Sequence, residues 1–240
     1  MNPGWRGVVG LVKPTYKPGS LESLIRLLPE GIGVIPLHIG ITSGTEQEFT
    51  QALKVGEQRA DELAALGVDL IQIGGAVPPM LLGYDADHKL AERLRQKYGI
   101  PVILTSTGMV KALRALSIKK LLGLTYLKED LNRKLARYLT DAGFEVTAIE
   151  GMDWPFKDAG KIPPTEVYAF AKKAFLRTGG ADAICLLSGG WNVFPIIETL
   201  ERDLQTPVLA IGQTELWDIL VSLRVREPIL GYGKLLSEKL

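Results

Sequence analysis

The two halves of this chain repeat the same order of short apolar segments. Residues 8–12 and residues 121–124 are apolar runs, and both lead into a Thr-Tyr pair. An amphipathic segment and a second apolar run follow in each half, and three later landmarks recur in the same order: Gly-x-Asp, paired glycines and x-Pro-Val. Apolar runs that alternate with amphipathic segments are typical of strands and helices in a parallel sheet. The sequence therefore predicts two copies of a domain with four β-α units.

The repeat places the expected elements along the chain. Strands are expected within residues 8–12, 33–37, 67–75 and 100–104 of the first half, and within residues 121–124, 144–149, 180–190 and 206–210 of the second. Helices are expected at residues 20–28 and 129–140, and also from near Thr45, Gly108, Thr165 and Thr214. Thr45 and Glu48 have the spacing of a capping box, in which each side chain binds a free N–H at the helix start.

Each half is expected to form one lobe, a four-stranded parallel sheet flanked by helices. Lobe one comprises residues 1–107 together with residues 214–240, and lobe two comprises residues 108–213. Open parallel sheets bind ligands beyond the carboxyl ends of their strands. The sequence thus predicts an α/β protein of two pseudo-symmetric lobes with the active cleft between them.

Composition narrows the classes of function. The 28 basic and 27 acidic residues leave a net charge of +1, so no strong field attracts nucleic acid or an anionic membrane. The first residues lack the pattern of a secretory signal, and no apolar run is long enough to span a bilayer. The single cysteine, Cys185, excludes an internal disulfide and suits a reducing compartment. We expect a cytoplasmic monomer or small homo-oligomer whose partner is a small carboxylate, not nucleic acid or a membrane.

Small residues follow the third strand of each half. Gly74, Gly75 and Ala76 end this strand in lobe one, and Ser188 with the pair Gly189-Gly190 ends it in lobe two. Glycines let backbone N–H groups approach a ligand closely, so these turns can bind a carboxylate or an enediolate oxygen. The alternative interpretation is that the glycines only permit tight turns.

The chemistry-bearing residues resemble a known family when they are taken in order. The segments that carry the resemblance are Thr105-Ser106-Thr107, Thr125-Tyr126, Ser188-Gly189-Gly190, Pro207-Val208, Trp217-Asp218 and Gly231-Tyr232-Gly233-Lys234. This set resembles arylmalonate decarboxylase, and the turn Gly212-Gln213 is similar to the Asn-Gln turn of maleate isomerases. Both groups belong to the aspartate/glutamate racemase superfamily. The resemblance implies two flavodoxin-like lobes and an enzyme that needs no metal and no organic cofactor.

The chain departs from this family at the catalytic positions. The resemblance implies a cysteine at the end of one or both third strands, but these positions hold Gly75 and Ser188. A serine hydroxyl is a weak reagent unless a neighbouring base takes its proton, whereas a thiolate is effective near neutral pH. Cys185 lies three residues before Ser188 and is expected to point to the other face of the strand as a buried apolar residue. A two-cysteine racemase is therefore excluded.

The candidate site contains donors from both lobes. Ser188 and Tyr126 are the candidate catalytic residues, although Tyr126 comes one residue earlier than the family's tyrosine. The expected substrate-binding residues are Thr15, Tyr16, Gly74, Gly75, Ala76, Gly189, Gly190 and Gln213. Lys13 and Lys17 flank the first strand end and could neutralise a substrate carboxylate, although exposed lysines mostly serve solubility.

Three functions remain open from the sequence. The first is a cofactor-independent decarboxylase or isomerase that acts on a small malonate- or maleate-type acid. The second is a carboxylate-binding homologue without catalysis, which the missing thiols favour. The third is a hydrolase with Ser188 as nucleophile, which requires a base within about 3 Å of that hydroxyl.

Overall fold

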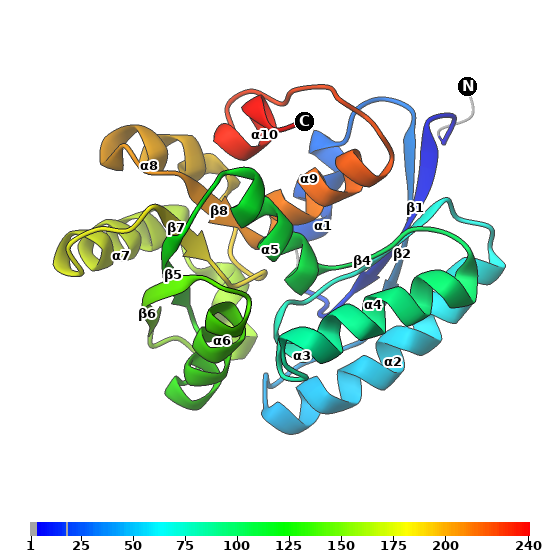
Figure 1. The fold of residues 1–240 in the computed structure, drawn as a ribbon, viewed down its shortest axis with the longest axis horizontal. Helices are drawn as coiled ribbons and strands as arrows, with labels where there is room; N and C mark the ends of the chain where they lie inside the picture. The colour runs from blue at the N-terminus through cyan, green and yellow to red at the C-terminus, as the bar shows by residue number, and fades with distance from the viewer. Residues whose placement is uncertain (1–3, 18) are drawn as a thin grey trace.

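A computed structural model describes residues 4–17 and 19–240 as two four-stranded parallel sheets flanked by helices (Figure 1). The first half contains β1 (Gly7–Lys13), α1 (Ser20–Leu27), β2 (Ile32–His38), α2 (Glu46–Ala65), β3 (Leu70–Ile73), α3 (Val77–Met80), α4 (Tyr84–Tyr98), β4 (Val102–Leu104) and α5 (Thr105–Ala115). The second half contains β5 (Lys120–Thr125), α6 (Glu129–Asp141), β6 (Glu145–Gly151), the 3-10 helix η1 (Phe156–Lys161), α7 (Pro164–Arg177), β7 (Ala183–Leu186), the 3-10 helix η2 (Phe194–Ile196), α8 (Ile197–Leu204), β8 (Val208–Ala210), α9 (Ile211–Ser222) and α10 (Lys234–Glu238).

The two sheets have the same topology. The strand order is β2-β1-β3-β4 in the first and β6-β5-β7-β8 in the second, so corresponding strands occupy corresponding places. Every pair is parallel, and the carboxyl ends of β1 and β3 lie together, as do those of β5 and β7. The predicted α/β fold with two pseudo-symmetric sheets is confirmed.

The repeated Gly-x-Asp landmark has one structural role in both lobes. The Oδ2 atom of Asp69 accepts a hydrogen bond from the Val8 N–H at 2.7 Å. The Oδ2 atom of Asp182 accepts from the N–H groups of Lys120 at 2.9 Å and Lys119 at 3.0 Å. Each carboxylate thus holds the start of an inner strand of its own sheet, β1 or β5. The Gly-x-Asp sequence therefore has a structural role in aligning these strands and no catalytic role.

Helices α5 and α9 pack against each other between the two sheets (Figure 1). Met109 and Leu113 of α5 and Leu216 and Leu220 of α9 are fully buried, in one hydrophobic cluster that includes residues of β1 and β5. Helix α9 also contacts α1 and β3 of the first half, and α10 packs on α9. On these contacts we propose that residues 214–240 belong with lobe one.

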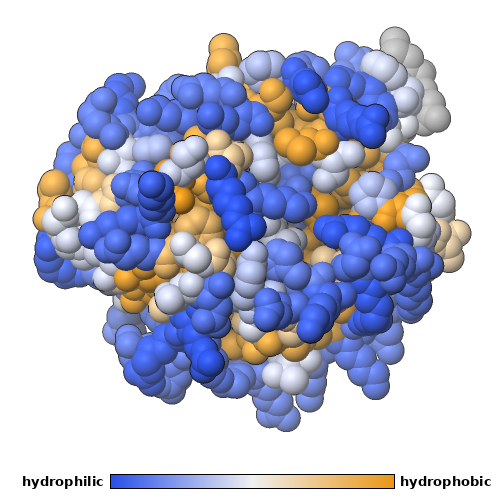
Figure 2. All heavy atoms as spheres, viewed as in Figure 1, coloured by the Kyte–Doolittle hydropathy of each residue, from blue (hydrophilic) through white to orange (hydrophobic). Residues whose placement is uncertain are grey.

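The face shown in Figure 2 is mostly hydrophilic, and its apolar side chains are separated by polar ones. Within residues 4–17 and 19–240, no helix is both long and apolar enough to cross a bilayer.

Two helices begin earlier than the sequence predicted. Strand β4 continues directly into α5 at Thr105, and β8 continues directly into α9 at Ile211, whereas starts near Gly108 and Thr214 were expected. The last strand residue is extended in both cases, and the next residue is already helical, so no loop marks the boundary in the sequence. The first turn of each helix therefore lies at the carboxyl end of its sheet.

Helix α2 begins as predicted, but its capping differs. Thr45 Oγ1 accepts from the Glu48 N–H at 3.2 Å, which is half of a capping box. The Glu48 carboxylate instead accepts from the backbone N–H groups of Thr42, Ser43 and Gly44. Glu48 thus holds the loop that precedes the helix, not the cap residue.

Candidate active site

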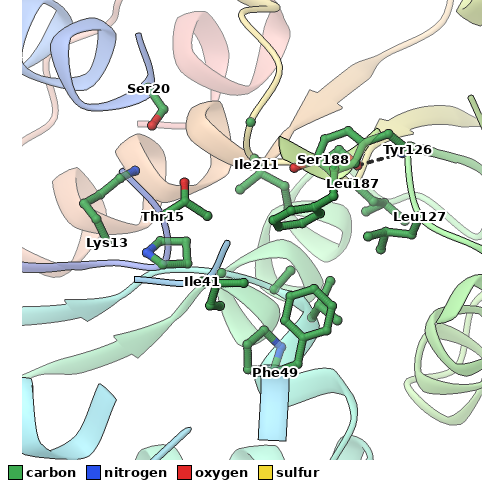
Figure 3. Close-up of a pocket in the computed structure, with 18 of the residues that line it drawn as sticks. Lys13, Thr15, Ser20, Ile41, Phe49, Tyr126, Leu127, Leu187, Ser188 and Ile211 are labelled. Atoms are coloured by element: carbon green, nitrogen blue, oxygen red, sulfur yellow. Dashed lines mark hydrogen bonds between the residues drawn. The ribbon is translucent and has the colours of Figure 1, made fainter. Parts of the chain in front are cut away.

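A cavity of ≈ 70 Å³ lies where the carboxyl ends of the two sheets meet (Figure 3). Its walls come from the segments that follow β1, β3, β5, β7 and β8, together with parts of α1, α2, η1 and α9. The lining residues are Lys13, Pro14, Thr15, Ser20, Ile41, Phe49, Gly75, Ala76, Val77, Pro78, Tyr126, Leu127, Phe156, Leu187, Ser188, Gly189, Gly190, Ile211, Gly212 and Glu215. The lining is predominantly apolar with a few polar groups, as is usual for sites that bind small organic ligands.

Ser188 follows β7 and is almost completely buried. Its Oγ atom accepts a hydrogen bond from the Tyr126 N–H at 3.2 Å, which is drawn as a dashed line in Figure 3. No described side chain accepts the Ser188 proton, and neither His38 nor His88 lines the cavity. The Ser188 hydroxyl therefore has a free proton at the cavity wall, and the base that a serine nucleophile needs is missing from the described residues.

Tyr126 supplies a second hydroxyl at the end of β5. Burial raises the pKa of this phenol to about 12, although a hydrogen bond from the Gly190 backbone opposes the rise. The ring lies edge-on to Phe156 at 5.7 Å and to Trp191 at 5.6 Å between centroids. At neutral pH Tyr126 is therefore protonated and can donate a hydrogen bond.

Lys13 is the last residue of β1, and its side chain lines the cavity. Only 6% of the residue is exposed, and no described side chain forms a hydrogen bond or close ion pair with its ammonium, although the Glu22 carboxylate is near enough to interact with its charge. Figure 3 shows Lys13, Thr15 and Ser20 on one side of the cavity, with Ser188 and Tyr126 on the other. An anionic ligand bound in the cavity would form a charge pair with this ammonium.

Lys17 lies behind the cavity wall, against two of its aromatic residues. Its Nζ atom is 3.6 Å from the centre of the Phe156 ring and 5.0 Å from that of Tyr126, and no described group forms a hydrogen bond to it. Burial lowers the pKa of Lys17 to about 8, while the charge of Asp158 opposes the change. Lys17 is thus mostly protonated at pH 7, and it connects the β1-α1 loop to η1 of the other lobe.

This pKa predicts a pH-dependent stability. Between pH 8 and 10.5 the unfolded chain binds the Lys17 proton more readily than the folded chain, so the free energy of unfolding rises with pH. Lys17→Met removes the buried charge and keeps the apolar stem, and should stabilise the protein by ~1–2 kcal/mol at pH 7, after allowance for partial solvent exposure. Urea denaturation at pH 7, 8, 9 and 10 should show that the difference in the free energy of unfolding between Lys17→Met and wild type becomes smaller as pH rises. A difference that does not change with pH would contradict the lowered pKa of Lys17.

The structure brings most of the expected binding residues to the cavity. Thr15, Gly75, Ala76, Gly189 and Gly190 line it together with Ser188 and Tyr126. Gly75 has φ +93, and a Cβ there would be 3.2 Å from Pro14 Cβ, so glycine is required at this position.

Three expected binding residues lie elsewhere. The Tyr16 side chain is 70% exposed and stacks on His38, because the loop after β1 turns it outward. Gly74 fits under β1, where a Cβ would be 2.6 Å from the Val12 carbonyl oxygen. Gln213 is fully buried, and its amide binds the Tyr232 carbonyl and the Ala210 N–H. Exposure or existing hydrogen bonds keep these residues away from a ligand in the cavity.

Sequence reasoning missed the acidic residue of the cavity, but it interpreted Cys185, which lies outside the cavity, correctly. Glu215 lines the cavity from α9, but a lone glutamate in the sequence of a helix carries no signal of that role. Cys185 is fully buried in β7, and burial raises the pKa of its thiol to about 12. The prediction that Cys185 is a buried apolar residue agrees with its place in the hydrophobic core.

The fold and the shared cavity define a class of two-lobed α/β proteins with a ligand site between pseudo-symmetric sheets. The family profile of arylmalonate decarboxylase matches residues 11–236. This chain therefore belongs to the arylmalonate decarboxylase family, and the resemblance seen in the sequence is confirmed.

Individual relatives agree with this membership. The chain is 23% identical over 215 residues to arylmalonate decarboxylase of Bordetella bronchiseptica, with 89% of each chain covered. It is 28% identical over 186 residues to maleate isomerase of Nocardia farcinica, with 74% of this chain and 72% of the relative covered. The solved structure of the maleate isomerase Iso from Pseudomonas putida S16 has a TM-score of 0.90 at 21% identity and covers 98% of this chain and 99% of its own. The two curated relatives are a decarboxylase and an isomerase.

Proposed function

We propose that this protein is a cofactor-independent decarboxylase or isomerase that acts on a small malonate- or maleate-type carboxylic acid. The observation that carries the proposal is that Lys13, a basic residue that is only 6% exposed, lines the same apolar cavity as Ser188 and Tyr126. The arylmalonate decarboxylase and maleate isomerase relatives are named for acids of this kind.

Lys13 and Thr15 are suited to hold one carboxylate group of the substrate. The ammonium supplies the charge and the hydroxyl supplies a directional donor, and both come from the carboxyl end of β1. Charge-assisted hydrogen bonds of this type are roughly twice as strong as neutral ones. The negative charge of the substrate would thereby compensate the buried charge of Lys13.

Donors on the opposite wall are suited to stabilise the charge that develops during the reaction. Ser188 and Tyr126 offer hydroxyl protons, and Gly189 offers a backbone N–H next to them. Fixed donors in a site that excludes water stabilise an enediolate more than water does. The apolar walls, including Phe49 and Phe156, favour loss of an uncharged carbon dioxide molecule from a charged acid.

An activity assay tests this function. Purified protein is incubated with phenylmalonate, methylmalonate and maleate, while carbon dioxide release and fumarate formation are followed. We expect turnover of at least one acid without added metal or cofactor. Thermal stabilisation by these acids without any turnover would contradict catalysis and favour the second candidate, a carboxylate-binding homologue, because a ligand that binds only the folded state raises stability.

A further inference from the structure

Glu215 brings a carboxyl group into the cavity from helix α9. The residue lies four positions after Ile211, so both project from one face of the helix, and both line the cavity. Only 6% of Glu215 is exposed. Glutamate is almost never buried to this extent unless it is paired or has a functional role.

The contacts of Glu215 orient its carboxyl group and leave much of it free. The Thr105 hydroxyl donates to Oε1 at 2.6 Å, and the Gln72 amide in turn donates to the Thr105 oxygen at 3.0 Å. Among the described residues, none donates a hydrogen bond to Oε2 and no cation pairs with Glu215. Since a carboxylate has about four acceptor positions, most of its capacity is left for a ligand.

The carboxyl group of Glu215 lies at the same strand end as Gly75. Thr105 Oγ1, which binds Glu215, is 3.3 Å from the carbonyl oxygen of Ile73, two residues before Gly75. Gly75 cannot carry a reactive side chain without strain, because its φ is +93 and Pro14 fills the space. Glu215 therefore supplies an ionisable group on the wall of β3, while Ser188 lies on the wall of β7.

Resting on the proposed function, we propose that Glu215 is the acid–base catalyst of this cavity. In decarboxylation, the bond between the α-carbon and the departing carboxylate breaks, carbon dioxide leaves, and the electron pair remains as an enediolate. The Glu215 carboxylate takes up a proton from water and passes it to the α-carbon, which leaves the carboxylate free again and a hydroxide ion in the solvent. In the opposite direction, the Glu215 carboxylate removes the α-proton of the product acid, so solvent deuterium enters at that carbon.

Glu215→Gln tests the proposal, because glutamine has nearly the same shape and can still accept the Thr105 hydrogen bond. With phenylmalonate as substrate, and phenylacetate in deuterium oxide for exchange, we expect kcat and the exchange rate to fall about 10²- to 10⁴-fold. Thermal stabilisation by phenylmalonate should persist, since the carboxylate-binding groups are unchanged. The control is Glu166→Gln, an exposed glutamate of α7, which should behave as wild type.

The outcomes separate this inference from the proposed function. If wild type turns over and Glu215→Gln stays within about threefold of it, Glu215 is not the catalyst and the function stands. If wild type neither turns over nor exchanges any acid, the function fails and the inference fails with it. Glu215→Asp is a second variant that keeps a carboxyl group at this position, one methylene farther from the substrate. Its rate should lie between those of wild type and Glu215→Gln. If Glu215→Asp is folded but no faster than Glu215→Gln, the proposal is overturned.

Discussion

Lys13→Met is expected to weaken the binding of small dicarboxylates by about 30- to 1000-fold, or ~2–4 kcal/mol. In wild type Lys13 lines the cavity and is only 6% exposed, so a bound carboxylate gains a charge pair that water screens poorly. Methionine keeps the length of the side chain and removes that charge. Isothermal titration of both proteins with malonate measures the difference.

The stability of the same variant serves as an internal check. Lys13 forms no hydrogen bond or close ion pair with a described side chain that the variant would lose, and methionine keeps the apolar stem, so free Lys13→Met should be about as stable as free wild type. Lys173→Met, which removes an exposed ammonium on α7, is the matched control and should leave malonate affinity unchanged. If wild type and Lys13→Met bind malonate with equal affinity at low ionic strength, Lys13 does not contribute to ligand binding.

Gly74→Ala is expected to destabilise the protein by about 2–4 kcal/mol, at the high end for a single added methyl group. A Cβ at Gly74 would lie 2.6 Å from the Val12 carbonyl oxygen and 3.1 Å from Pro14 Cδ. The nearest atom belongs to the backbone of β1, and the Gly74 N–H binds that same carbonyl, so neither strand can move without loss of the bond. Urea denaturation of wild type and variant gives the change in the free energy of unfolding.

The control for this comparison is Gly56→Ala in the interior of α2. A Cβ at Gly56 would make only ordinary contacts at 3.6 Å, and alanine has the higher helix propensity. We expect Gly56→Ala to be neutral or stabilising by up to about 1 kcal/mol. Loss of less than about 1 kcal/mol in Gly74→Ala would show that β1 and β3 can separate locally.

The sequence predicted the fold well because the duplication is expressed in local patterns. Apolar runs and turn residues marked the strands of both sheets, and equivalent landmarks fixed the correspondence between lobes. The starts of α5 and α9 were placed about three residues late, because β4 and β8 enter their helices without a turn. Sequence patterns mark the end of a strand by its turn residues, so a strand that continues directly into a helix leaves no such mark.

The site was less predictable, because its contacts join residues far apart in the chain. Because Ser188, Gly189 and Thr15 follow strands, the sequence alone could place them at the cavity. The sequence carried no information on side-chain direction, so it did not show that Tyr16 points to solvent. Glu215 acquires its place only through Thr105, 110 residues earlier. No local pattern encodes such a contact.

Phe156, Tyr126 and Leu127 line both the cavity and a larger groove of ≈ 720 Å³, which runs between residues 43–46 of the first half and residues of the second half. The Phe156 ring also reaches across to lobe one, where it lies edge-on to Phe49 and covers the Lys17 ammonium. A molecule that moves between groove and cavity must displace this ring and, with it, the bridge between lobes. Passage by this route would thus require the contacts of Phe156 with Phe49 and Lys17 to break, which links access to the cavity with the packing of the two halves against each other.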